Sequence, residues 1–206
     1  HLLFELSGDH PDLAHAEALA LLTKSSCSPS LSSRGDLWSA FEVSHPPPFH
    51  LLGMTQRVFQ LLTQTFDSSE ALLSSLRTHP PDFTEGSFVV RHAGFDGRDI
   101  AEVQSLCSAI GAVYFDIGRK VDVKHPDNTL VVISNNKGIW LGLLVHRRDK
   151  DDFIKRHVKN RPFFSPISLH PKIVRGFINV LHSKGETMVD PFCGTGGFLL
   201  EAASID

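Results

Sequence analysis

The chain has 206 residues, of which 41% are hydrophobic and 21% are charged, and its formal net charge is −3. This composition is that of a folded protein with room for two small domains, and it excludes an intrinsically disordered chain. No apolar run has the length of a membrane span and the first residues lack the features of a signal peptide, so we expect a cytoplasmic protein with no membrane partner.

The N-terminal part predicts two strands and one helix. Residues 2–6 are almost entirely apolar, which is typical of a buried strand. We expect a helix over residues 11–25, where Pro11 suits the first turn and apolar residues recur at helical spacing. Residues 25–35 are rich in Ser, Pro and Gly and predict a loop, and the alternation over residues 36–43 predicts a second strand.

Prolines and capping residues mark the elements that follow. Three prolines at positions 46–48 exclude a central strand there, because proline has no N–H to donate. Residues 51–66 fit a helix or a strand, and we favour the strand. Asp67 and Glu70 have the spacing of a capping box that starts a short helix. After a strand over residues 87–92, Asp99 and Glu102 form a second such box, which predicts a helix over 100–110.

A hairpin and a glycine-rich loop complete the pattern. Residues 130–133 and 139–145 are apolar and flank an Asn-Asn-Lys-Gly turn, so they predict two antiparallel strands. A helix over residues 171–183, a short strand over 187–189 and a helix beginning at Gly197 are expected next. Strands and helices alternate, which predicts an α/β or α+β fold.

Cysteine and histidine spacing argues against a metal site. Cys27, Cys107 and Cys193 lie far apart, which fits neither a disulfide framework nor a zinc site. None of the 12 histidines stands in a ligand motif, and His10 and His15 are five residues apart, so they do not share a helix face. We therefore expect reduced thiols and no metal.

Positive charge is concentrated in one stretch of the chain. Residues 145–161 contain seven basic and three acidic side chains, whereas residues 1–76 contain three basic and eight acidic ones. A basic stripe of this kind contacts nucleic-acid phosphates, although a solvated helix or linker is the alternative explanation.

The sharpest motif is the glycine-rich segment at residues 190–198. Gly194, Gly196 and Gly197 allow positive φ angles and close approach of a ligand to the backbone, and the following helix begins with free N–H groups. Asp190 places a carboxylate near an ammonium or hydroxyl group of such a ligand. The segment lacks the Gly-Lys-Ser/Thr of a Walker loop and the later glycine of a dinucleotide fingerprint. A tight connecting turn remains the alternative.

Several segments carry a family resemblance. Asp-Pro-Phe-Cys-Gly-Thr-Gly-Gly at 190–197 resembles the first motif of amino-group methyltransferases that use S-adenosylmethionine. Residues 161–171 resemble the segment that leads into the catalytic domain of archaeal-type tRNA guanine-10 N2-methyltransferases. Residues 90–95, 121–127 and 139–143 are similar to a THUMP domain, and residues 5–11 with 16–18 to the N-terminal ferredoxin-like domain of that family.

The resemblance implies a domain order. It gives a ferredoxin-like domain over residues 1–80, a THUMP RNA-binding domain over 81–150 and a basic linker over 151–170. Residues 171–206 would be the first helix, strand and glycine loop of a Rossmann-like methyltransferase domain. The implied fold class is thus α/β with an α+β front end.

The resemblance also implies an activity and its residues. A methyl group would pass from S-adenosylmethionine to the exocyclic amine of a tRNA guanosine, expected at position 10. The residues expected to bind the cofactor are Asp190, Pro191, Phe192, Cys193, Gly194, Thr195, Gly196 and Gly197, with Phe164, Ser165, Pro166 and Ile167 covering one side. The last four fit a buried linker equally well. The residues expected to contact tRNA phosphates are Lys137, Arg147, Arg148, Lys150, Lys155, Arg156, Lys159 and Arg161, and the face around Arg91 and Lys124 is the alternative.

Part of the family pattern is missing from these residues. The Asp/Asn-Pro-Pro-Tyr loop that would hold the target amine does not occur, so the catalytic residues are expected after Asp206 and the chain alone is expected to be inactive and to bind S-adenosylmethionine poorly. Two alternatives stay open: a ribosomal-RNA guanine-N2 or DNA adenine-N6 methyltransferase, and a non-catalytic THUMP-type RNA-binding protein. The sequence also leaves open whether a small activator subunit is required.

Overall fold

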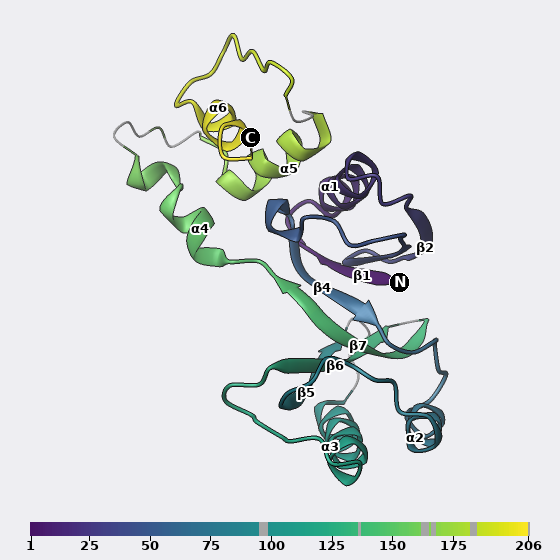
Figure 1. Cartoon of the computed structure of the whole chain (residues 1–206). Coiled ribbons are helices and arrows are strands. Elements are labelled where there is room, and N and C mark those ends of the chain that lie inside the picture. Colours follow the sequence, from purple (N-terminus) through teal and green to yellow (C-terminus); the bar gives the residue numbers. More distant parts are fainter. Residues whose placement is uncertain (95–98, 136, 162–164, 166–167, 182–184, 206) are drawn as a thin grey trace. The chain divides into compact units, whose positions relative to one another are not determined.

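The computed structural model describes residues 1–94, 99–135, 137–161, 165, 168–181 and 185–205. The fold is mixed α/β, and its seven-strand sheet has the order β2-β3-β1-β4-β7-β6-β5 (Figure 1). The chain divides into two compact units: unit 1 is His1–Val58 with His146–Asp206, and unit 2 is Phe59–Val145. These limits differ from the expected domain boundaries near residues 80 and 150, and the division into ferredoxin-like and THUMP domains stays a prediction.

Strand β1 (Leu2–Leu6) is at the centre of unit 1, as its apolar sequence predicts. It pairs antiparallel with β3 (Trp38–Glu42), and β4 (Thr55–Leu61) begins in the same unit. Helix α1 (Pro11–Lys24) packs its apolar side on alternate residues of β1, which include the fully buried Phe4. The predicted strands and helix of this region are confirmed.

One strand of unit 1 does not follow the prediction. The loop expected over residues 25–35 is wrong in its second half, because β2 (Ser30–Arg34) pairs antiparallel with β3. The register shifts between Leu31 and Ser33, as in a β-bulge. Most of β2 is exposed at the edge of the sheet. All of its residues except Leu31 are polar, so it lacks the alternation that identifies a half-buried strand.

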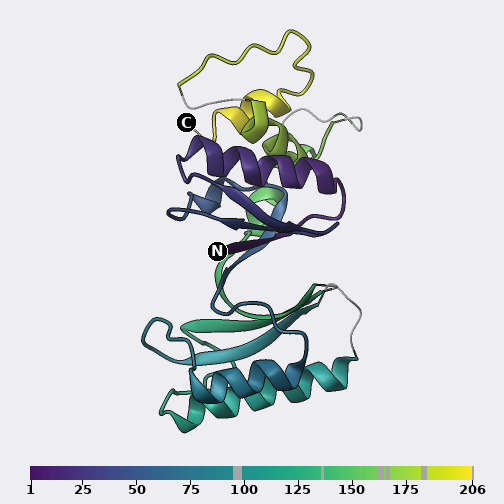
Figure 2. The same cartoon turned by 90° about the vertical axis from the view of Figure 1, so that its right-hand side faces the viewer.

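Unit 2 contains the predicted hairpin. Strand β6 (Asn128–Asn135) pairs antiparallel with β7 (Gly138–Arg147), most of which lies in this unit, and parallel with β5 (Phe88–Gly94). Helices α2 (Ser69–Thr78) and α3 (Ile100–Asp116) lie on the same side of these strands (Figure 2). The helices and strands share one apolar core, so their packing against each other holds unit 2 together.

Two helix starts in unit 2 test the capping predictions. Asp99 caps α3, as expected, and its carboxylate accepts from the backbone N–H of Ala101 at 2.6 Å. The N-cap of α2 is Ser68, whose hydroxyl accepts from the N–H of Ala71 at 3.2 Å, so the cap expected at Asp67 is wrong. Both residue types are good N-caps, which explains the one-residue error.

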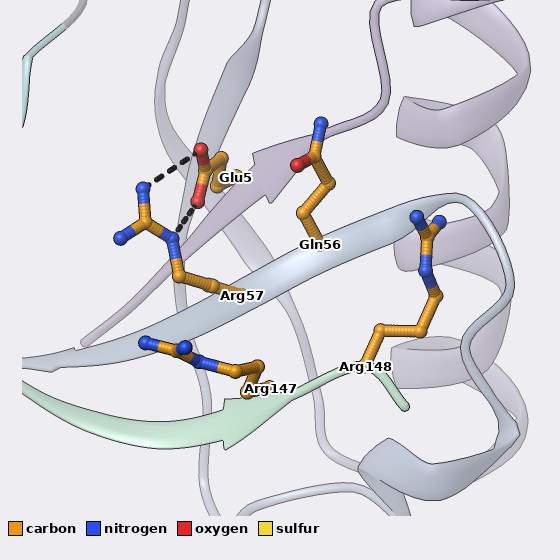
Figure 3. A pocket seen from close by; sticks show the side chains of 5 residues that line it. All are labelled: Glu5, Gln56, Arg57, Arg147 and Arg148. Carbon is orange, nitrogen blue, oxygen red and sulfur yellow. Dashed lines mark hydrogen bonds and ion pairs between the residues drawn. The ribbon is translucent and has the colours of Figure 1, made fainter. Parts of the chain in front are cut away.

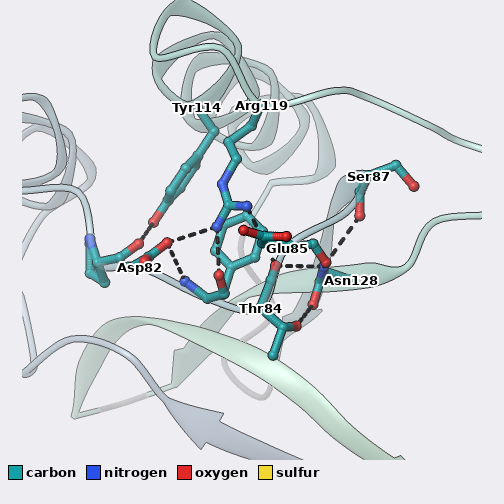
Figure 4. A network of polar contacts seen from close by, with 9 residues as sticks. Asp82, Thr84, Glu85, Ser87, Tyr114, Arg119 and Asn128 are labelled. Carbon is teal, nitrogen blue, oxygen red and sulfur yellow. Dashed lines mark hydrogen bonds and ion pairs between the residues drawn. The ribbon is translucent and has the colours of Figure 1, made fainter.

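A network of polar contacts fixes the segment that precedes β5 (Figure 4). Nη2 of Arg119 donates to Oδ1 of Asp82 at 2.7 Å and to the carbonyl of Phe83 at 2.5 Å. The buried Tyr114 donates its hydroxyl to the carbonyl of Pro81 at 2.9 Å, and burial raises the pKa of Tyr114 to about 12. These bonds satisfy backbone groups in a segment that has neither helix nor strand.

The C-terminal part of unit 1 is helical. It contains α4 (Lys150–Lys155), α5 (Pro171–Leu181), which confirms the predicted helix, and α6 (Gly197–Ala202). Helix α5 packs against α1 and α6 (Figure 1). The strand expected over residues 187–189 is wrong: a strand requires a hydrogen-bonded neighbour, and the described residues after 150 form only helices, turns and loops. Two single 3-10 turns complete the unit, η1 (Phe49–Leu51) and η2 (Val158–Asn160).

No helix in the described part of the chain is long and apolar enough to cross a membrane.

A buried carboxylate joins distant segments of unit 1. Oε1 of Glu17, on α1, accepts from the backbone N–H of Gly53 and from Nδ2 of Asn179, on α5, each at 2.7 Å. Its Oε2 accepts from the N–H of Met54 at 2.7 Å. Burial raises the pKa of Glu17, and these donors together with the charge of Arg175 oppose that rise. The carboxylate thus fixes α1, the start of β4 and α5 together.

We predict that Glu17→Gln lowers the free energy of unfolding by about 1–3 kcal/mol, because an amide has one acceptor oxygen and would leave a buried N–H facing its own NH2 group. Chemical denaturation followed by circular dichroism measures the change. The control is Glu42→Gln at the exposed end of β3, which removes the same formal charge and is expected to leave stability nearly unchanged. Equal stability of the two variants would contradict the prediction.

Candidate functional site

The glycine loop has a backbone that only glycine adopts readily. Gly194 and Gly196 have φ values of +52° and +72°, in the left-handed region. A Cβ built on Gly196 would meet nothing within 4 Å, so the space beside the loop is open. Gly196 is the N-cap of α6, and its N–H donates to the carbonyl of Cys193 at 2.7 Å. The residues therefore form a tight turn that exposes bare backbone, which fits a ligand lying against it.

The first residues of the loop are accessible. Asp190 is half-buried, and its Oδ1 accepts from the N–H of Phe192 at 3.0 Å, which fixes the turn. The side chain of Phe192 is 93% exposed, and Cys193 has a free, exposed thiol. Pro191 is also exposed. The start of the loop is therefore open to solvent.

Two side chains hold the loop at Thr195. The hydroxyl of Ser168 lies 2.9 Å from that of Thr195. Nη1 of Arg161 lies 3.5 Å from the carbonyl of Thr195, while its Nε donates to the carbonyl of Arg156 at 3.0 Å. Arg161, which was predicted to contact tRNA, therefore lies beside the glycine loop, 3.6 Å from the position of a Cβ on Gly197.

The segment predicted to cover the cofactor is described only in part. Phe164, Pro166 and Ile167 lie outside the described residues. Ser165 is half-buried, and its carbonyl accepts from the N–H of Ser168 at 3.2 Å. This contact places Ser165 next to the residue that bonds Thr195, so it lies close to the loop, and its role toward a cofactor stays a prediction.

Helix α6 is anchored by a buried carboxylate. The side chain of Glu201 is fully buried and pairs with Nε of Arg156 and with Nη2 of Arg175, each at 2.8 Å. The guanidinium of Arg156 also lies 4.9 Å from the ring centre of Phe153 on α4. Burial lowers the pKa of Arg175, and the charge of Glu201 opposes that effect. Glu201 thereby fixes the helix after the glycine loop to α4 and α5.

The eight predicted phosphate contacts have different environments. Arg147, Lys155 and Lys159 are exposed in unit 1, and Lys137 is exposed in the hairpin turn of unit 2. Arg148, Arg156 and Arg161 are half-buried and bind acceptors within the protein. The side chain of Lys150 lies outside the described residues. The structure thus brings Arg147 and Arg148 into one pocket and gives Arg156 a structural ion pair.

That pocket contains charged residues that the sequence prediction missed. It has a volume of about 400 Å³ in unit 1 and is lined by Glu5, Gln56, Arg57, Arg147 and Arg148 (Figure 3). Glu5 and Arg57 form a two-pronged ion pair in which Nη2 donates to Oε1 at 2.9 Å. The available signal was a single acidic residue, Glu5, in the otherwise apolar strand β1, and a single basic residue, Arg57, in β4.

The described residues contain no group of three or more His, Cys, Asp or Glu that could hold a metal ion.

Comparisons with known proteins relate both the loop and the whole chain to methyltransferases. A family model described as "RMKL-like, methyltransferase domain" matches residues 158–206, which include the glycine loop. The tRNA (guanine(10)-N2)-dimethyltransferase of Pyrococcus abyssi is 29% identical over 96% of this chain and 59% of its own length. The enzyme of the same name from Methanothermobacter thermautotrophicus is 30% identical over the same shares.

The chain is similar to the archaeal tRNA (guanine(10)-N2)-dimethyltransferases. The resemblance predicted from its motifs is thereby confirmed. The chain spans about 59% of the length of these relatives.

Solved structures share the fold. TrmN from Thermus thermophilus superposes with a TM-score of 0.64 at 22% identity, covering 100% of this chain and 62% of that one. A predicted N6-adenine-specific DNA methylase from Listeria monocytogenes gives a TM-score of 0.61 at 15% identity, covering 99% of this chain and 54% of that one. At these identities the likeness establishes the mixed α/β fold of this chain.

We predict that Glu201→Gln lowers the free energy of unfolding of unit 1 by about 3–5 kcal/mol, because it leaves the buried Arg175 with an uncompensated charge and also removes the ion pair with Arg156. Denaturation measures the loss, and hydrogen exchange is expected to increase at the amides of α6 and the glycine loop. The control is Glu70→Gln, an exposed residue of α2. Unchanged protection of α6 in the Glu201 variant would show that the ion pairs do not anchor the loop.

Proposed function

We propose that the protein is a tRNA guanine-N2 methyltransferase that uses S-adenosylmethionine. The observation that carries this proposal is the similarity to two archaeal tRNA (guanine(10)-N2)-dimethyltransferases over 96% of the chain, together with a glycine loop inside the matched methyltransferase segment. Position 10 of tRNA is the proposed target because it is the position named for both of these enzymes.

The loop residues are suited to holding S-adenosylmethionine. When bound, this cofactor supplies an electrophilic methyl group. The left-handed turn at Gly194 and Gly196 presents backbone to the ligand without a side chain in the way. Asp190 lies at the start of the loop, where its carboxylate can accept from hydroxyl or ammonium groups. The exposed ring of Phe192 adds an apolar surface.

The other parts of the chain are proposed to bind and orient tRNA. Arg147, Lys155 and Lys159 are exposed cations within one stretch of unit 1, and contacts of this kind position a nucleic acid through its phosphates. Residues 1–80 and 81–150 would act as the ferredoxin-like and THUMP domains of the family. Recognition of a folded RNA by shape fits such modules, because the base edges of an RNA helix are poorly accessible. Orientation of the guanine amine toward the methyl group would then supply much of the rate enhancement.

We predict that Asp190→Ala in the complete gene product abolishes methyl transfer to a tRNA transcript while leaving tRNA affinity within about twofold, because Asp190 serves the cofactor. Incorporation of a labelled methyl group and fluorescence anisotropy measure the two quantities. Asp116→Ala, at the exposed end of α3, is the control and is expected to retain activity. A transcript in which guanosine 10 is replaced by adenosine tests the position. Full activity on that transcript would refute the proposed target.

We predict that exchanging Lys155 and Lys159 for Gln reduces tRNA affinity and lowers the slope of log K against log salt by roughly 0.7–0.9 for each lost phosphate contact. A salt titration of tRNA binding by the 206-residue chain measures the slope. The matched control exchanges Lys120 and Lys124, which are exposed in unit 2. If only the control pair lowers the slope, the RNA surface is the alternative face around Arg91 and Lys124.

A further inference from the structure

We infer that the pocket lined by Glu5, Gln56, Arg57, Arg147 and Arg148 binds a phosphate group of the RNA backbone (Figure 3). This inference rests on the proposed function for the source of the phosphate, and it assigns a site and a ligand class to Arg57 and Glu5, which the sequence prediction did not include.

The charge of the lining favours an anion. Three guanidinium groups and a single carboxylate face the pocket, so it has an excess of two positive charges. The planar guanidinium matches phosphate oxygens in a two-pronged geometry and stays protonated under all ordinary conditions. Burial lowers the pKa of Arg148, which a bound anion would counteract. The volume of about 400 Å³ lies within the range of about 300–1,000 Å³ typical of ligand pockets.

Strand geometry makes two of the cations, Arg57 and Arg147, converge. Arg57 on β4 and Arg147 on β7 extend from neighbouring strands toward the same side (Figure 3). The backbones beside these two arginines are hydrogen-bonded to each other, because the N–H of Arg148 donates to the carbonyl of Gln56 at 2.9 Å. Successive side chains of a strand alternate in direction. The register between β4 and β7 therefore determines that Arg57 and Arg147 lie on the same side. The convergence is therefore a property of the strand pairing and does not depend on a mobile loop.

Two of the three arginines are positioned before any ligand binds. Glu5 holds Arg57 through its two-pronged ion pair, and the side chain of Glu5 is only 14% exposed. Nη1 of Arg148 donates to the carbonyl of Gly53 at 2.5 Å. Binding to side chains that are already fixed costs less conformational entropy. Glu5 is thus a positioning residue, and Arg147, which is exposed, completes the set when the phosphate enters.

The lining also identifies which part of an RNA would bind. All five side chains are polar or charged, and none is aromatic, so a base has no ring on which to stack. Contacts to phosphate position an RNA without reading its sequence. The pocket is therefore a backbone contact that fixes the orientation of the tRNA on unit 1.

The test uses a charge-neutral double variant, Glu5→Gln with Arg57→Gln. This exchange removes one cation and one anion, so the net charge is unchanged while the positioned guanidinium of Arg57 is lost together with the Glu5 carboxylate that holds it. We expect tRNA affinity to fall about tenfold or more and the salt slope to fall by roughly 0.7–0.9. The matched control is Asp12→Asn with Arg34→Gln, which removes the exposed Asp12–Arg34 ion pair of the same unit outside the pocket and is expected to change neither.

A second variant and a second ligand keep the test decisive. Arg147→Gln alters an exposed side chain, so it reports on the pocket if the double variant does not fold. Inorganic phosphate titrated into the chain is expected to shift the Nε–Hε NMR signals of Arg57 and Arg147 in a saturable manner, and Arg147→Gln is expected to weaken that response.

Each outcome bears on one of the two proposals. If the wild-type chain binds tRNA and both pocket variants match the Asp12–Arg34 control, the pocket inference is overturned and the proposed function stands. If the chain binds no tRNA but phosphate shifts saturate, the proposed function fails and the pocket remains a phosphate site. The absence of saturable phosphate shifts together with unaltered tRNA binding in the variants would exclude the pocket.

Discussion

The arrangement of unit 1 depends on one buried carboxylate. Glu17 accepts from two backbone N–H groups at the start of β4 and from Asn179 on α5. Burying the Glu17 carboxylate without hydrogen-bond donors would be strongly unfavourable. The fold therefore favours the arrangement of α1, α5 and the residues before β4 in which all three donors reach the carboxylate. Helix α5, which lies within the segment similar to methyltransferases, is consequently positioned by a residue of α1. Through α5 and Arg175, the same contact extends to Glu201 and to the helix after the glycine loop.

Arginine has two roles in this protein, and the surroundings of the paired carboxylate differ between them. Arg156 and Arg175 neutralise the buried Glu201 and hold α6 in place. Arg57 is paired with Glu5 yet lines a pocket that is open to solvent, so its pairing orients the guanidinium without enclosing it. A count of basic residues along the sequence cannot distinguish these roles, because the distinction lies in partners that are distant in the chain.

Local signals were sufficient for most of the elements. The apolar run of β1, the Asn-Lys-Gly turn of the hairpin and the cap of α3 at Asp99 act within a few residues, and each was predicted. The edge strand β2 was missed because an exposed strand needs no apolar pattern. The glycine loop was recognised from its composition, whereas the pocket was not, since Glu5 and Arg57 are 52 positions apart and meet only through the sheet.

The division of unit 1 into two stretches of sequence has a consequence for its synthesis. The residues of unit 2 are contiguous, so that unit has all of its chain as soon as position 145 has left the ribosome. Unit 1 must wait for Asn179, which is made 125 residues after Met54. At about 5–20 residues per second, this interval is roughly 6–25 s. During that time the carboxylate of Glu17 lacks one of its donors, and the part of α1 that contacts α5 is uncovered. Unit 2 is therefore expected to be ordered first, and the contact between α1 and α5 forms only when α5 has been made.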